Sequence, residues 1–184
     1  MHFLAHLASR LFGASLIGLS IFVSIETLSR KLFNFSFEGA DELGGYVLAV
    51  GSSLAFVVAL VDRAHIRIDV FHARFPPKLQ AIMDWLSIVS LATLGAFMIY
   101  VGRIVVIDTV SYGSTAPTPW ATPLIYPQAV WFAALCLFSF CATLLAVKAT
   151  YMVATGRLDD LSEHFHPKGT NEELEEELGD LKRR

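Results

Sequence analysis

The chain has 184 residues, of which 54% are hydrophobic and 17% charged, and its mean hydropathy is +0.55. This composition is too apolar for an ordinary soluble domain, so a membrane protein is expected. A net charge of −3 without a basic region excludes a general nucleic-acid-binding protein, and too few residues lie outside the apolar segments for a separate soluble catalytic domain.

Four apolar segments are long enough to cross a bilayer as helices, at about 11–29, 43–61, 84–107 and 124–150. A hydrocarbon core of about 30 Å needs about 20 mainly apolar residues, because a helix rises about 1.5 Å per residue. We therefore predict an all-α integral membrane protein with four transmembrane helices. The predicted domains are a four-helix membrane domain, 1–157, and a polar cytoplasmic tail, 158–184.

The first span carries one acidic residue, Glu26, near its outer end. Arg30 follows four residues later, so both side chains would lie on the same side of a helix. This spacing favours a boundary ion pair near the headgroups, or a contact to a partner helix, over a proton or cation site. In the next connection, 30–42, phenylalanines alternate with polar residues, which predicts an interfacial anchor.

The second span contains a row of small residues, Gly51, Ala55 and Ala59. Their spacing of four places them on one helix face, where small side chains let another helix approach closely. That helix could belong to this chain or to another subunit, and the sequence leaves both interpretations open.

The connection after the second span, residues 62–80, alternates basic, acidic and apolar residues before a Pro-Pro break. It is predicted to form an interfacial turn and short helix on the cytoplasmic face. His65, Asp69 and His72 could align on a helix face. They lack a further tight ligand, and Arg67 lies among them, so no metal site is predicted.

The connection between Asp108 and Pro127 contains four prolines and three aromatic residues but no Lys or Arg. This composition predicts a stiff, uncharged outer loop with interfacial aromatic side chains.

Sequence motifs for catalysis are missing from the chain. It has no Gly-rich phosphate loop, nucleophile elbow or H-E-x-x-H motif. Cys136 and Cys141 lie in one apolar span, where thiols usually pack as small apolar groups. We therefore predict no enzyme, no metal and no cofactor.

The distribution of Lys and Arg predicts that both chain ends are cytoplasmic, because cytoplasmic loops are enriched in these residues. This N-in, C-in arrangement places seven Lys and Arg residues near the span ends on the cytoplasmic side and three on the outer side. The inner residues are Arg10, Arg63, Arg67, Arg74, Lys78, Lys148 and Arg157, and the outer ones are Arg30, Lys31 and Arg103.

Residues 42–77 resemble the small membrane subunit of tripartite ATP-independent periplasmic (TRAP) transporters, the DctQ type. Glu42-Leu43 enters a span rich in Gly, Ser and Ala, and the segment from Arg63 to Val70, RAHIRIDV, precedes a Pro-Pro break. Arg30 and the Thr-Pro and Tyr-Pro steps before the fourth span are similar to the same family's pattern. The resemblance covers about residues 10–150.

The resemblance implies a four-helix protein of a bacterial inner membrane. Its partners would be a large TRAP membrane subunit, which carries the sodium and substrate sites, a periplasmic substrate-binding protein, and membrane lipids. The small subunit would be a non-catalytic scaffold for sodium-driven uptake of an organic anion, a carboxylate such as a dicarboxylate or sialic acid.

Eight residues are predicted at the subunit or lipid interface: Arg30, Glu42, Gly51, Ala55, Ala59, His65, Arg67 and Asp69. Polar contacts at the membrane edge are expected for Glu42, Arg67 and Asp69, among themselves, to headgroups or to the large subunit. The alternative function is a self-sufficient small oligomeric transporter or channel with Glu26 or Asp108 as pathway charges. The third candidate function is that of a membrane anchor that binds a metal or haem.

Overall fold

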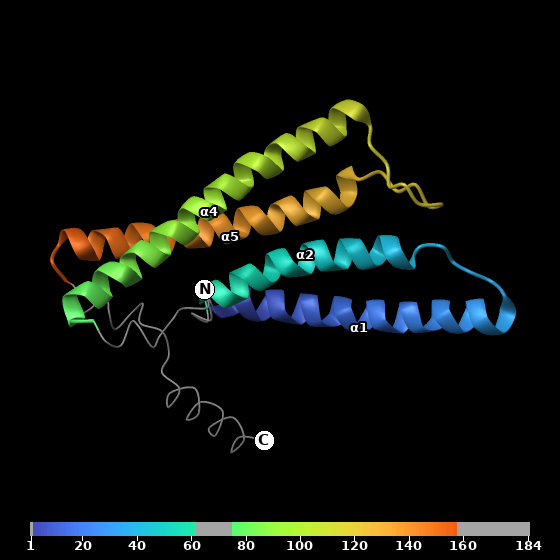
Figure 1. The fold of residues 1–184 in the computed structure, drawn as a ribbon, viewed down its shortest axis with the longest axis horizontal. Helices are drawn as coiled ribbons and strands as arrows, with labels where there is room; N and C mark the ends of the chain where they lie inside the picture. Colours follow the sequence, from blue (N-terminus) through green and yellow to red (C-terminus); the bar gives the residue numbers. More distant parts are fainter. Residues whose placement is uncertain (1, 62–74, 158–184) are drawn as a thin grey trace, which may run out of the picture.

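The computed structural model of the chain describes residues 2–61 and 75–157 (Figure 1). It has four long helices in these residues, each apolar enough to cross a membrane. Their bounds are α1 (His2–Phe33), α2 (Ala40–Val61), α4 (Pro77–Tyr112) and α5 (Ile125–Ala154). The prediction of an all-helical protein with four spans is confirmed.

Most helix ends lie beyond the predicted spans, and local signals at the ends of α4 show why. Pro76 is extended, with ψ of 151°, and Pro77 occupies the first turn of α4, where its missing N–H is not needed. Gly113 ends the helix in the left-handed conformation, with φ of 58°, and donates its N–H to the Thr109 carbonyl. Helix α4 therefore begins before the predicted start at residue 84 and includes residues 77–80 of the predicted interfacial segment.

The helices form two antiparallel hairpins that meet along α2 and α5. Helix α1 packs on α2, α2 on α5, and α5 on α4. Figure 1 shows α1 and α2 running side by side and α4 crossing α5. The two central helices are thus α2 and α5, and much of α1 is left exposed to the surrounding medium.

Two apolar clusters hold the bundle together, and both include α5. One joins α5 to α2, and its buried members are Val57, Leu60, Phe138, Cys141 and Ala142. The other joins α5 to α4, with Ala81, Ile88, Ala146, Ala149 and Met152. Small residues dominate the second cluster, as expected where membrane helices gain stability through close backbone contact.

At Gly95, α4 lies close to the backbone of α5. A Cβ atom built on this glycine would lie 3.1 Å from the Cα, Cβ and Oγ atoms of Ser139. Any larger residue would therefore press against the backbone of α5, which cannot move as a side chain can.

Candidate functional site

Several polar side chains that hydrogen-bond to other parts of the chain lie where two connections meet. These connections are residues 34–39, between α1 and α2, and residues 113–124, between α4 and α5. We call this part of the structure the loop end. Two buried carboxylates, Glu26 and Glu42, organise it, with 2% and 6% of their surfaces exposed.

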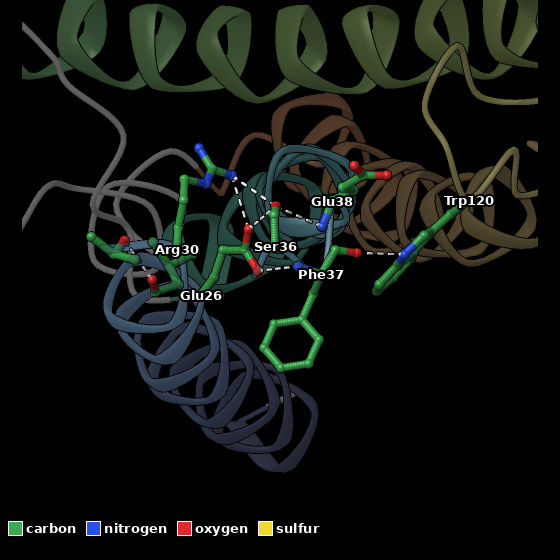
Figure 2. A network of polar contacts seen from close by, with 8 residues as sticks. Glu26, Arg30, Ser36, Phe37, Glu38 and Trp120 are labelled. Carbon is green, nitrogen blue, oxygen red and sulfur yellow. Dashed lines mark hydrogen bonds and ion pairs between the residues drawn. The ribbon is translucent and has the colours of Figure 1, made fainter. Parts of the chain in front are cut away.

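Glu26 binds the connection that follows its own helix. Its carboxylate accepts a hydrogen bond from Arg30 Nη2 at 2.8 Å and another from the backbone N–H of Phe37 at 2.7 Å. The Ser36 hydroxyl donates to the same carboxylate (Figure 2). The predicted Glu26–Arg30 pair is present, but the chain after α1 also folds back onto it.

This fold-back needs unusual backbone conformations on both sides of Ser36. Asn34 and Glu38 have left-handed φ angles of 52° and 57°. Asparagine tolerates this region better than most residues do. The Glu38 N–H donates to the Ser36 hydroxyl at 3.2 Å, so Ser36 links the turn to the carboxylate of Glu26.

Glu42 ties the first hairpin to the second. It lies in the first turn of α2, where a negative charge is favoured by the helix dipole. The Tyr46 hydroxyl donates to it at 2.9 Å, and the Thr118 hydroxyl also donates. Thr122 adds further hydrogen bonds to this carboxylate. A residue of α2 and two residues of the connection between α4 and α5 thereby share one buried acceptor.

Trp120 makes a second link between the same connections. Its indole N–H donates to the Phe37 carbonyl at 2.8 Å, as Figure 2 shows. Its ring covers Gly39 so closely that a Cβ atom there would lie 2.2–2.4 Å from ring atoms. The Phe22 ring meets Trp120 edge-on, with centroids 6.4 Å apart. Trp120, one of the aromatic residues predicted at the membrane interface, therefore packs between the two connections.

The connection 113–124 is held in a narrow shape by its own backbone. Thr115 and Pro123 form an isolated antiparallel bridge. The Ala116 N–H donates to the Thr122 carbonyl at 2.9 Å, and the Leu124 N–H donates to Ser114 at 3.0 Å. These bonds present Thr118 and Trp120 together at the tip, which explains how both reach the first hairpin.

The small residues of α2 face α1. Gly51 is buried beneath Phe12, since a Cβ atom there would lie 2.0 Å from the Phe12 ring. Ala55 and Ala59 line a groove of about 330 Å³ between α1 and α2. At Gly51 the small residue thus serves packing inside the chain, whereas the other two border open space.

The predicted interface residues are divided between several places. Arg30 and Glu42 both lie at the loop end, but they belong to different networks. Arg30 donates to the carboxylate of Glu26, whereas the carboxylate of Glu42 accepts from Thr118. His65, Arg67 and Asp69 lie outside the described residues, as does the predicted tail, 158–184.

Sequence reasoning missed the partners of the two carboxylates. Ser36, Phe37, Thr118 and Thr122 were not predicted to contact Glu26 or Glu42. Thr118 and Thr122 each precede a proline in the connection before the fourth helix. A threonine hydroxyl held in a stiff, proline-rich loop was therefore the sequence signal for a hydrogen-bond donor to a carboxylate.

The loop-end arrangement joins the two connections through its carboxylates and Trp120. Both carboxylates accept several hydrogen bonds from the surrounding chain. Across residues 2–61 and 75–157, no cluster of three His, Cys, Asp or Glu side chains could hold a metal ion. The geometry therefore supports a fixed relation between the two hairpins.

Comparison with protein families gives a match over residues 19–151. The matching family is described as "Tripartite ATP-independent periplasmic transporters, DctQ component". The match includes the loop end, all of α2 and α4, most of α5 and the C-terminal part of α1. Searches among curated proteins and among solved structures found no match.

Proposed function

Because the chain belongs to the DctQ family of TRAP transporter components, we propose that it is the scaffold for a large TRAP membrane subunit. The family is non-catalytic, and its members are multi-pass inner-membrane proteins. The complex would carry out sodium-driven uptake of an organic anion. A periplasmic binding protein would deliver this anion, a carboxylate such as a dicarboxylate or sialic acid.

The family match over most of the chain is the observation that carries this proposal. The sequence adds support, because no charged residue occurs in 11–25, 43–61, 85–102 or 124–147. Ion-coupled transporters place ionisable or broken-helix sites near the middle of the membrane. A scaffold does not need them, so sodium coupling is assigned to the partner.

The loop end supports a scaffold role through its construction. Glu42 and Trp120 connect two helical hairpins through side chains that are far apart in sequence. Such links resist sliding of one hairpin against the other. A moving transport subunit needs a surface of this kind that keeps its shape.

We propose the N-in, C-in orientation, which places the loop end on the periplasmic side. The excess of Lys and Arg on the opposite side supports it. Arg67 and Asp69 are then proposed to make polar contacts at the cytoplasmic edge, to the large subunit or to headgroups. If Arg67→Ala and Asp69→Ala chains assemble and support uptake like the wild type, this assignment fails.

Reconstitution into liposomes tests the proposed function. The complete complex with the binding protein should accumulate a labelled organic anion when an inward sodium gradient is imposed, and liposomes containing this chain alone should not. Flux through this chain alone, and its loss in Glu26→Gln, would instead support an independent transporter or channel.

A further inference from the structure

An open groove lies between α1 and α2, at the opposite end of this hairpin from the loop end. It is lined by Ala8, Ser9, Phe12 and Gly13 of α1 and by Ala55, Val58 and Ala59 of α2. The groove has a volume of about 330 Å³ and a mainly apolar lining. It exists because small residues on both helices leave space that larger side chains would fill.

The groove is bounded on one side by an aromatic ring. Phe12 lines it and also lies against Gly51, one turn before Ala55. In the other direction the groove runs toward the first turns of α1 and the last turns of α2. Its apolar part therefore lies inside the membrane, close to one membrane surface.

Among the residues that the structure describes, Arg10 places a positive charge near the groove. Arg10 is exposed and belongs to the same turns of α1 as the groove residues. Side chains of a helix lean toward its N-terminus, so Arg10 can extend toward the membrane surface. Residues 1–25 contain no Asp or Glu, and residues 43–61 contain no charged side chain. An acidic headgroup would meet no repulsion from these residues.

We propose that this groove binds an acyl chain of an anionic phospholipid whose phosphate group pairs with Arg10. An apolar groove within a bilayer is adjacent to lipid tails, which supply the matching apolar surface. The arginine adds a preference for a negative headgroup. This binding belongs to the chain itself and does not depend on the proposed transport function.

The test is native mass spectrometry of the purified full chain, mixed with either dioleoylphosphatidylglycerol or dioleoylphosphatidylcholine. The two lipids have the same acyl chains, so they separate groove binding from headgroup pairing. We expect the wild type to retain the anionic lipid preferentially. Equal retention of both lipids, or of neither, would overturn the proposal.

Matched variants locate the bound lipid. Gly13→Leu should fill the groove and remove the preferential retention. Gly18→Leu should leave it intact, because both glycines have open space around them but only Gly13 lines the groove. Circular dichroism confirms that both variants keep their helices. Equal retention by the two folded variants would contradict the proposal.

A second pair of variants tests the charge. Arg10→Gln should weaken binding of the anionic lipid about fivefold, since one basic residue near a membrane surface contributes on that order. Arg103→Gln, which removes an exposed arginine from α4, should not. A photoreactive amino acid in place of Ala59 should capture lipid when the full chain is in its native membrane. Capture of a polypeptide there would show that a protein helix occupies the groove and would overturn the proposal.

Discussion

At the residue scale, Glu26 and Glu42 hold different parts of the chain with the same chemistry. Each is a carboxylate removed from solvent and supplied with several donors. Buried charges persist only where such donors replace water. Glu26 fixes the connection after α1, and Glu42 fixes the connection between α4 and α5 to α2.

Replacing Glu26 by Gln should lower the unfolding midpoint of the chain in detergent by several degrees. The amide keeps the shape but loses the charge that strengthens the bonds from Arg30 and the Phe37 N–H. Glu38→Gln is the matched control, because Glu38 is an exposed glutamate of the same connection. Thermal unfolding followed by circular dichroism gives both midpoints. Equal midpoints would show that Glu26 does not hold the connection.

Replacing Gly39 by Ala should displace Trp120 and destabilise the chain by about 1–3 kcal/mol, as overpacking does. The added methyl group would overlap the indole ring, which lies over Gly39. Gly44→Ala is the control, since nothing lies within 4 Å of a Cβ atom at that position. Trp120 fluorescence, measured after replacing Trp85 and Trp131 by Phe, should change only in Gly39→Ala. An unchanged spectrum in that variant would contradict the packing.

The sequence was informative about the Glu26–Arg30 pair because it is local. A spacing of four residues on a helix fixes which side chains meet. The bonds from Thr118 to Glu42 and from Trp120 to Phe37 join residues far apart in the chain. They depend on loop conformations, such as the left-handed Ala121 with φ of 47°, that no periodic pattern reveals.

At the element scale, hydrophobic length predicted the four helices, but it did not predict their ends. Apolar composition reports which residues fit the hydrocarbon core, whereas caps and prolines decide where a helix starts and stops. Helix α4 illustrates the difference, since it begins at Pro77 and ends at Gly113. The hydrophobic pattern also did not predict which helices pack against each other, because every span is apolar on most sides.

Replacing Gly95 by Val should separate α4 from α5 and lower stability by about 1–3 kcal/mol. The reason is the 3.1 Å distance from a Cβ atom at this position to the backbone of Ser139. Gly18→Val in α1 introduces the same side chain where nothing lies within 4 Å. Denaturant unfolding in a mixed detergent system compares the two. Equal stability of both variants would show that the helices do not approach this closely.

At the scale of the whole molecule, two hairpins pack together along α2 and α5 and are connected again at the loop end. Membership of the DctQ family, a family of transporter components, accounts for a chain built of four apolar helices. The family was predicted from a resemblance in residues 42–77, which include the segment between α2 and α4. Residues 62–74 of that segment lie outside the described residues.

The proposed orientation predicts opposite labelling of the two ends in intact bacterial cells. In a chain whose native cysteines are replaced by Ser, Tyr112→Cys should react with a membrane-impermeant maleimide. Ala154→Cys should react only after the inner membrane is opened. Both positions are exposed in the structure, so burial does not limit the reaction. The reverse pattern would invert the topology.

The most direct measurement of the central claim is co-purification of the tagged full chain, expressed with the large TRAP membrane subunit in mild detergent. The account predicts that the two proteins elute together at a stoichiometry near one to one. Elution of this chain by itself, together with solute or ion flux when it is reconstituted alone, would contradict the claim that it works as a scaffold subunit.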